Sequence, residues 1–272
     1  KMAIEVLIKY ERQKLQSIRR QTKKERFIEM ITSEDHADPK GLRRLAEELQ
    51  YREDIIRIPI LCCLEQPQYQ KDFLESVKKG RLHKSEDISF ALDEKYILIF
   101  KTMDSTEKRM FAEYKYILAE YLQGTLQWMQ REGIVCRFYI GTFQNIFLKY
   151  HYAYRHCRWL EKNTKSRHNS VYFYDHICDF VQSIVPEDEL DHIFNVYRKL
   201  LPEDMQNSCK ELINTLVDTN FNTAKASEAL YMHKNTFLYQ YNKIRDVLNV
   251  NPQSSYEDKW FLIFLQLFLR KK

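Results

Sequence analysis

The spacing of apolar and polar positions changes along the chain, and each change marks a different kind of expected structure. From residue 2 to residue 32 the apolar positions recur at helical spacing beneath many Lys and Arg side chains, which predicts one long helix. Its narrow apolar seam, broken at Glu11, consists of Ile4, Ile8, Leu15 and Ile18. Such a seam suits a coiled coil or a helix along a partner as well as a helix packed on its own domain, and the pattern leaves both open.

From residue 53 the apolar period shortens, and β-branched runs alternate with amphipathic stretches. The expected strands lie within residues 55–65, 133–141 and 170–177, and in a hairpin over 87–101 with its turn at Asp93-Glu94. The expected helices cover residues 105–132 and 145–163. Strands and helices that alternate at this length predict an α/β sandwich, in which helices pack on one mostly antiparallel sheet.

From residue 185 onward the apolar spacing is helical to the end of the chain. A short helix is expected over residues 223–230, with Asn222 as its N-cap because the side-chain oxygen can accept an early backbone N–H. Tyr231 and Met232 then make a turn, and a second helix begins at His233. Its inward positions are expected to be Phe237, Tyr241, Ile244 and Leu248. Two short helices joined by a tight turn are typical of a helix-turn-helix motif.

The outward side of this second helix carries side chains suited to DNA. They are expected to be His233, Lys234, Asn235, Thr236, Leu238, Tyr239 and Asn242. Lys can neutralise a phosphate or donate to guanine, Asn can pair with adenine through two hydrogen bonds, and Thr and Tyr hydroxyls reach phosphate oxygens. We therefore expect DNA contacts from His233, Lys234, Asn235, Thr236, Tyr239 and Asn242, with His233 either capping the helix or touching a phosphate. A three-helix packing unit that binds no DNA would show the same apolar spacing.

The stretch "ALYMHKNTFLYQYNKI", residues 229–244, resembles the C-terminal signature of CdaR/PucR-type bacterial regulators of sugar-diacid and purine catabolism. The family consensus is close to A-L-x-x-H-R-N-T-L-x-Y-R-L, and Lys234 keeps the charge of the usual Arg. The matching positions are Ala229, Leu230, His233, Asn235, Thr236 and Tyr239. Residues 53–178 are similar to the degenerate cyclase-like domain of the same family, through "IGTFQNIFLKYHYAYRHCRWLEKN" and "SVYFYD".

The resemblance implies an α+β, mostly helical protein: an N-terminal helix, a central α/β sandwich like a degenerate GGDEF domain, and a C-terminal all-α, Fis-like helix-turn-helix domain. The expected domains are an N-terminal helical region available for dimerisation (1–52), the cyclase-like domain (53–180), a helical linker (181–206) and the helix-turn-helix domain (207–272). The implied function is transcription regulation by a homodimer on double-stranded DNA.

Two features depart from the family pattern. The family usually has basic residues where this chain has Leu238 and Gln240, which should remove phosphate contacts and weaken binding. The sensing domain that full-length members carry is not seen ahead of residue 53, so it was never there or lies outside this chain.

Composition and charge change this interpretation only slightly. A net charge of +5 suits an anionic partner without requiring one. With five glycines the chain holds neither G-x-x-x-x-G-K-[ST] nor G-x-G-x-x-G, so we expect no nucleotide cofactor. The six cysteines lack disulfide or zinc spacing, and we expect free thiols and no metal, including at His156-Cys157 and at His176 with Cys178. Residues 260–269 form an apolar run too short to cross a bilayer and no signal peptide is evident, so a soluble, cytoplasmic protein is expected.

Two other classes of function remain as alternatives. A nucleotide cyclase would need a Gly-Gly-acidic-acidic turn, and no glycine precedes Asp93 and Glu94, so we expect no catalytic residues and no enzyme. A ligand-sensing or protein-interaction module with weak or lost DNA binding fits the absence of basic residues at Leu238 and Gln240. In that case the middle domain would bind an unknown small-molecule effector, and the aromatic helix near the end of the chain would dock a partner instead of closing a core.

Overall fold

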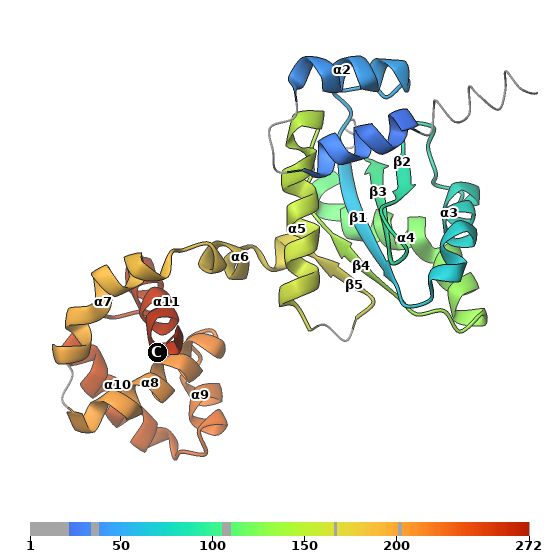
Figure 1. Cartoon of the computed structure of the whole chain (residues 1–272). Coiled ribbons are helices and arrows are strands. Elements are labelled where there is room, and N and C mark those ends of the chain that lie inside the picture. The colour runs from blue at the N-terminus through green and yellow to red at the C-terminus, as the bar shows by residue number, and fades with distance from the viewer. Residues whose placement is uncertain (1–21, 34–37, 105–109, 166–167, 201–202, 272) are drawn as a thin grey trace, which may run out of the picture. The chain divides into compact units, whose positions relative to one another are not determined.

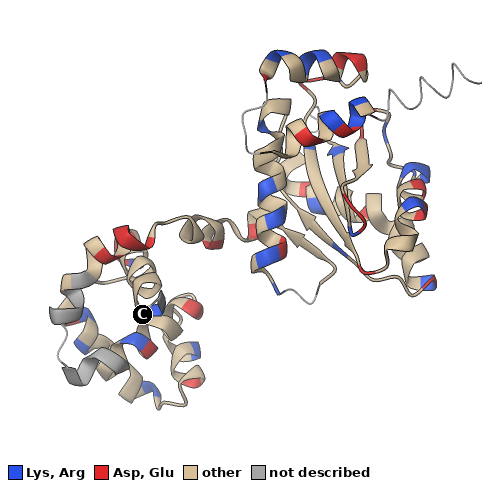
Figure 2. Ribbon diagram, viewed as in Figure 1, with Lys and Arg blue, Asp and Glu red and all other residues tan. Residues whose placement is uncertain are grey.

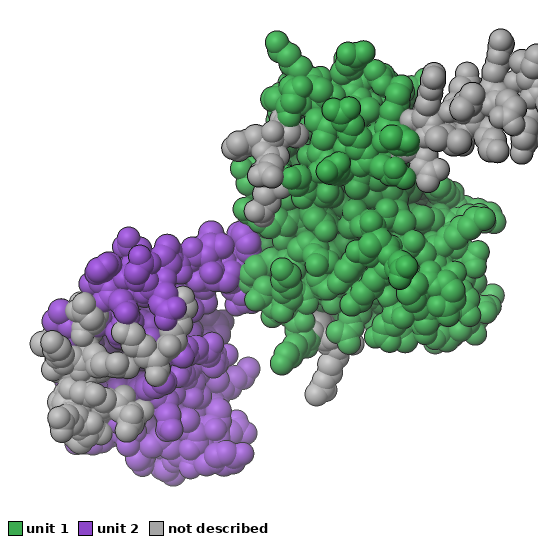
Figure 3. Space-filling model, viewed as in Figure 1, with its two compact units in different colours: residues 1–177 green, residues 178–272 purple. Residues whose placement is uncertain are grey.

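The computed structural model of the chain describes residues 22–33, 38–104, 110–165, 168–200 and 203–271. It divides into two compact units, residues 1–177 and residues 178–272 (Figure 3). The first unit holds a mixed sheet with helices, and the second is helical throughout its described residues (Figure 1). The predicted fold class, mostly helical with a central sheet and a C-terminal helical domain, is confirmed.

The sheet of the first unit has the strand order β2-β3-β1-β4-β5. The strands are β1 (Arg57–Leu64), β2 (Ile88–Ala91), β3 (Tyr96–Thr102), β4 (Cys136–Ile140) and β5 (Ser170–Tyr172). β1 pairs antiparallel with β3 and β4, and β2 pairs antiparallel with β3. Among the strands of the described residues, β5 alone runs parallel to its neighbour, β4. The prediction of a mostly antiparallel sheet is therefore correct.

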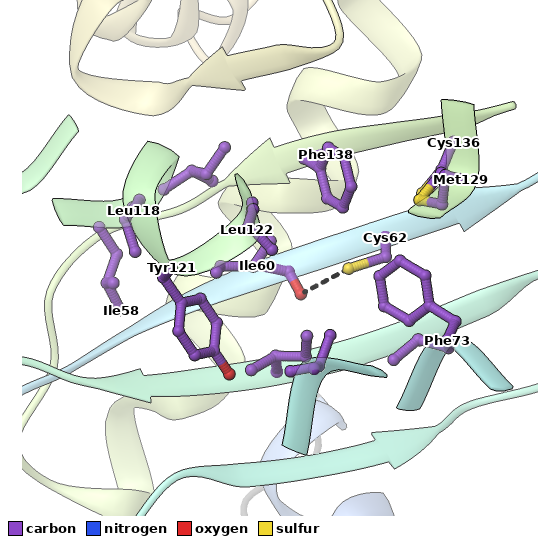
Figure 4. Close-up of a cluster of buried hydrophobic side chains, with 14 of the residues drawn as sticks. Ile58, Ile60, Cys62, Phe73, Leu118, Tyr121, Leu122, Met129, Cys136 and Phe138 are labelled. Carbon is purple, nitrogen blue, oxygen red and sulfur yellow. Dashed lines mark hydrogen bonds between the residues drawn. The ribbon is translucent and has the colours of Figure 1, made fainter. Parts of the chain in front are cut away.

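Helices cover both faces of this sheet. On one face lie α3 (Gln70–Lys79) and α4 (Met110–Arg131), and on the other lies α5 (Tyr150–Asn163) (Figure 1). Figure 4 shows the first of these layers, where β1 side chains such as Ile60 meet Phe73 of α3 and Leu122 of α4. On the opposite face the ring of Phe100 stacks on Tyr150 of α5, with centroids 4.3 Å apart. Because both faces are covered, β1 is buried along its whole length, which explains why every residue after Arg57 in this strand is apolar.

The remaining elements of this unit are short. They are a helix over residues 22–32, α2 (Pro39–Glu48), and the 3-10 helices η1 (Pro67–Tyr69), η2 (Phe147–Lys149) and η3 (Phe173–Asp175). In the helix over 22–32, Phe27 and Ile31 are buried, and the Phe27 ring lies 5.4 Å from that of Phe147. This part of the predicted N-terminal helix thus packs on its own unit. The seam from Ile4 to Ile18 lies outside the described residues.

A buried ion pair lies where β3 ends beside the start of β2. The Lys101 ammonium donates to both oxygens of Asp87, at 3.0 and 3.2 Å, and also lies over the ring of Tyr121. The Asp87 carboxylate accepts a further hydrogen bond from the backbone N–H of Thr102 at 2.7 Å, and His83 Nδ1 is 3.3 Å away. The side chains of Lys101 and Asp87 are 2% and 0% exposed. Burial lowers the pKa of Lys101, and the neighbouring Asp87 charge works against that change.

The helices of the second unit are α6 (Ile177–Ser183), α7 (Glu187–Leu200), α8 (Glu203–Asp218), α9 (Thr223–Ala229), α10 (Lys234–Leu248) and α11 (Tyr256–Lys271). In this unit α7 to α11 pack around one apolar core, and α6 precedes them without a buried residue. Residues 187–200 of the expected linker belong to this unit, because Leu190 and Phe194 of α7 are part of its core. In α11, Leu262, Leu265 and Phe268 are buried. That helix therefore closes the core.

The polar residue in the middle of α11 is paired. Gln266 is 3% exposed, and its amide donates to the backbone oxygen of Asn214 and to Asp218 Oδ1, both at 3.0 Å. Arg270 also contacts the Asp218 carboxylate, at 2.5 Å. The pairing ties α11 to α8 and explains how a buried amide is tolerated. Within the described part of the chain, no helix has both the length and the apolar character needed to cross a bilayer.

Candidate nucleic-acid interface

The first of the two short helices, α9, begins as the sequence predicts. The Asn222 side-chain oxygen accepts hydrogen bonds from the backbone N–H groups of Ala224 and Lys225, at 3.1 and 3.0 Å. These are two of the N–H groups that a helix leaves without internal acceptors. Further along, Ala226 and Ser227 are buried, and small side chains at these positions let α9 lie close to its neighbours.

The turn after α9 is a Schellman motif. The N–H of Met232 donates to the oxygen of Ser227 at 2.9 Å, and the N–H of Tyr231 donates to that of Glu228 at 3.0 Å. Tyr231 takes the left-handed conformation that this motif requires, with φ of 52°. Met232 turns back against the core of the unit, so the chain leaves α9 in a fixed direction.

The second short helix, α10, is capped by His233. The ring nitrogen Nδ1 of His233 accepts from the backbone N–H of Asn235 at 3.3 Å. An accepting Nδ1 carries no proton, so a neutral ring holds its proton on Nε2, where it can donate elsewhere. Of the two roles that the sequence allows for His233, the structure has the cap.

The inward side of α10 is as predicted. Phe237, Tyr241 and Ile244 are buried, and Leu248 is half-buried against the same core. Burial raises the pKa of Tyr241, so this phenol stays neutral as part of the core. These contacts hold α10 against α9 and fix which of its residues face water.

The six predicted contact residues are all exposed, and they extend from the N-cap of α10 to its middle. His233, Lys234, Asn235 and Thr236 form its first turn. Tyr239, which is 72% exposed, follows three residues after Thr236, and Asn242 follows three residues after Tyr239. Besides His233, which caps the helix, Asn242 also has a partner within the protein, because its side-chain oxygen accepts from Arg245 Nη1 at 3.3 Å. The sequence thus identifies a continuous exposed edge, within which Asn242 already has a protein partner.

The expectation that Leu238 faces outward is wrong. Leu238 is half-buried and packs against the core of the second unit, and Gln240 is also half-buried. An apolar side chain at position 238 therefore has a packing role. This role accounts for the absence of a Lys or Arg there, one of the two departures from the family pattern. Figure 2 shows Lys and Arg interspersed with acidic residues over the described helices of this unit.

The Asp93-Glu94 turn of the first unit is a simple hairpin. The Asp93 side chain accepts from the backbone N–H groups of Lys95 and Tyr96, at 2.8 and 2.9 Å, and the turn joins β2 to β3. This carboxylate is occupied in stabilising the turn. Of the six cysteines, all free, five are buried and Cys178 is exposed.

Comparison with known proteins identifies the second unit. Residues 210–267 match the PucR C-terminal helix-turn-helix domain, so the resemblance seen in residues 229–244 is confirmed there. No curated protein matched the chain. Among solved structures, the chain is similar to the regulator of polyketide synthase expression from Bifidobacterium adolescentis. The identity is 11% and the TM-score 0.44, over 93% of this chain and 94% of that one.

Proposed function

We propose that this chain is a DNA-binding transcription regulator that reads DNA with the exposed edge of α10. The observation that carries the proposal is that the polar residues 233–236 are exposed at the start of the second helix of a segment that matches a helix-turn-helix domain. In helix-turn-helix proteins this part of the second helix enters the major groove. The positive end of the helix dipole at Lys234 adds attraction for phosphates.

Each side chain of the edge suits a different contact. Lys234 neutralises a phosphate or donates to guanine, and Asn235 pairs with adenine through two hydrogen bonds. The hydroxyls of Thr236 and Tyr239 donate to phosphate oxygens. His233 continues to cap α10 through Nδ1, and its Nε2–H donates to the DNA backbone. Asn242 can contribute only by giving up or sharing its hydrogen bond with Arg245, so we expect it to matter least.

The test is fluorescence anisotropy on duplexes selected from a random pool, with the intact chain and a Lys234→Ala, Asn235→Ala variant. We expect wild type to bind a selected duplex with strong salt dependence. The variant should lose a few kcal/mol, at about 1–3 kcal/mol per good base contact. The slope of log affinity against log salt should fall by about one.

A matched control exists in the same chain. Lys162 and Asn163 form the same dipeptide on exposed positions at the end of α5, in the first unit. Lys162→Ala with Asn163→Ala removes the same charge and amide, and should leave DNA affinity unchanged. If no duplex is enriched, or if the 234/235 variant binds as well as wild type, α10 does not read DNA.

The regulator should act as a homodimer, because one recognition helix reads few base pairs and a second half-site supplies the rest of the affinity. The dimer contact would come from the N-terminal region or from the first unit. Phe27 and Ile31 are buried in their own unit, so within residues 1–32 the seam from Ile4 to Ile18 is the better candidate. Sedimentation of the complex with the selected duplex tests this, and a strictly monomeric complex would refute it.

The alternative is a ligand-sensing module with weak DNA binding. It is favoured by a surface hollow of about 640 Å³ between α3 and α4, whose lining includes Tyr69, Ser76 and Trp128. A hollow of this size could hold a small effector. The ligand-sensing function is favoured over DNA reading if no duplex is enriched and the chain still folds. Magnesium-dependent turnover of GTP would instead indicate an enzyme.

A further inference from the structure

Tyr231 holds a backbone conformation that its side chain makes costly. It is the residue after the C-cap of α9, the position in a Schellman motif where glycine is normal. Its φ of 52° brings Cβ close to backbone atoms, a conformation that residues other than glycine, Asn and Asp adopt rarely. A tyrosine at this position makes the turn less stable than a glycine would.

The other positions of positive φ show two ways in which such a cost is reduced, although the exposed, polar Gln50 uses neither. Among described residues other than glycine, φ is also positive at Gln50, Asp54, Asn220, Phe221 and Asn249. Asp and Asn tolerate this region because their side chains are short and polar. Phe221 is the other aromatic residue, and its ring packs against the core with Lys259 Nζ 6.0 Å from its centroid. Burial of the ring thus offsets the strain at Phe221.

No such compensation exists at Tyr231. Its residue exposure is 99%, so the ring lies in water and buries nothing within the second unit. Tyr231 therefore combines an unfavourable backbone conformation with the exposure of a large, partly apolar side chain to water. A partner bound over the turn would bury the ring and so offset the cost, as burial of the ring does at Phe221.

The position of Tyr231 indicates what binds there. It precedes the capping residue His233 by two positions, so it lies beside the end of α10 that carries Lys234 and Asn235. When the first turn of a recognition helix enters the major groove, the turn before it lies at the groove edge, along the sugar-phosphate chain. Tyrosine suits that surface, because its hydroxyl donates to phosphate oxygens.

We infer that Tyr231 is a DNA-backbone contact, with its hydroxyl donating to a phosphate oxygen and its ring lying against the sugar. The inference rests on the proposed function and extends the interface from α10 to the turn before it. The contact is independent of base sequence, unlike that of Asn235. It positions the recognition helix on the duplex without selecting the base pairs.

The test compares Tyr231→Phe and Tyr231→Gly with wild type, using the intact chain. Tyr231→Phe keeps the ring and should weaken binding about tenfold, as expected for one hydrogen bond to a charged group. The loss should be equal on the selected duplex and on a scrambled one. Because the hydroxyl is uncharged, the slope of log affinity against log salt should stay at the wild-type value, whereas Lys234→Ala lowers it by about one.

Tyr231→Gly separates binding from stability. It should leave the Tm of the second unit unchanged or raise it by a few degrees, while DNA affinity falls further than in Tyr231→Phe. The control is Asn249→Gly, which places glycine at the left-handed position at the other end of α10. That variant should bind DNA like wild type.

The outcomes distinguish the inference from the function on which it rests. If wild type selects no duplex, the proposed function fails and the inference fails with it. If wild type binds and both Tyr231 variants bind equally well, only the inference is overturned. A marked fall in Tm for Tyr231→Gly would show that the residue stabilises the fold, which would also overturn it.

Discussion

Replacing Asp87 by Asn would leave the buried Lys101 ammonium without its counter-charge. The side-chain shape is kept, and one oxygen remains to accept from the N–H of Thr102. Removing one partner of a buried ion pair usually costs about 3–5 kcal/mol, because the other charge is left in a poorly solvating site. Lys101 is only 2% exposed, so water cannot replace the lost carboxylate.

The cost has an upper limit, because Lys101 can release its proton. From the ordinary lysine pKa of 10.5, deprotonation at pH 7 costs about 1.4 kcal/mol per pH unit, or about 4.8 kcal/mol. The expected loss at pH 7 is therefore about 3–5 kcal/mol. In the variant the folded-state pKa of Lys101 lies below its unfolded value, so the unfolded chain binds more protons and stability rises with pH. At pH 9 the limit falls to about 2 kcal/mol.

Urea unfolding at pH 7 and at pH 9 measures the loss of stability of the variant at each pH. Trp128 and Trp159 report on the first unit, and a Trp260→Phe background silences the second. Adding Lys101→Met to Asp87→Asn should recover much of the loss, because no unpaired charge remains. A loss below about 1 kcal/mol at pH 7, or one that does not shrink at pH 9, would refute the reasoning.

Changes at four further positions test other parts of the molecule. Asn222→Ala removes the cap of α9 and should lower the free energy of unfolding of the second unit by about 1 kcal/mol. Calorimetry should show a Tm lower by about 4–8 °C, whereas Asn222→Ser should keep most of the capping stability. Burial lowers the pKa of His156 to about 4, so the first unit should lose stability as pH falls from about 6.5 towards 4, and a pH series on His156→Gln should be flatter. Phe237→Ala empties a fully buried site and should cost about 3–5 kcal/mol by urea unfolding. Tyr239→Ala, on the exposed edge, should leave stability within about 0.5 kcal/mol and weaken only DNA binding.

The features that sequence could predict are those that depend on neighbouring residues. Asn222 and His233 are helix caps whose partners lie two or three residues away, so composition and spacing suffice to find them. The inward stripe of Phe237, Tyr241 and Ile244 follows from the helical period alone. The exposed edge of α10 was predictable as the complement of that stripe.

The features that sequence missed depend on which elements meet. Leu238 lies at the border of the stripe on α10, and only the position of the neighbouring helices decides that it packs inward. The parallel pairing of β5 with β4 joins strands about thirty residues apart, and local spacing gives no direction for it. Tyr231 could have been noticed, because a turn that follows a helix often needs a left-handed residue and no glycine is present there.

The place of α7 in the second unit affects how this helix-turn-helix unit could be transplanted into another protein. The ring of Phe194 lies between α11 rings, 5.6 Å from Phe261 and 5.8 Å from Phe268. A fragment that begins at residue 207 would lack Phe194, so the rings of Phe261 and Phe268 would be exposed to water. The fragment would tend to self-associate through this surface. The stretch that matches by sequence begins at residue 210 and therefore leaves out α7, which contributes Leu190 and Phe194 to the core of the unit. A transferable helix-turn-helix unit has to begin before α7, near residue 185, so that it includes the helix that covers these α11 rings.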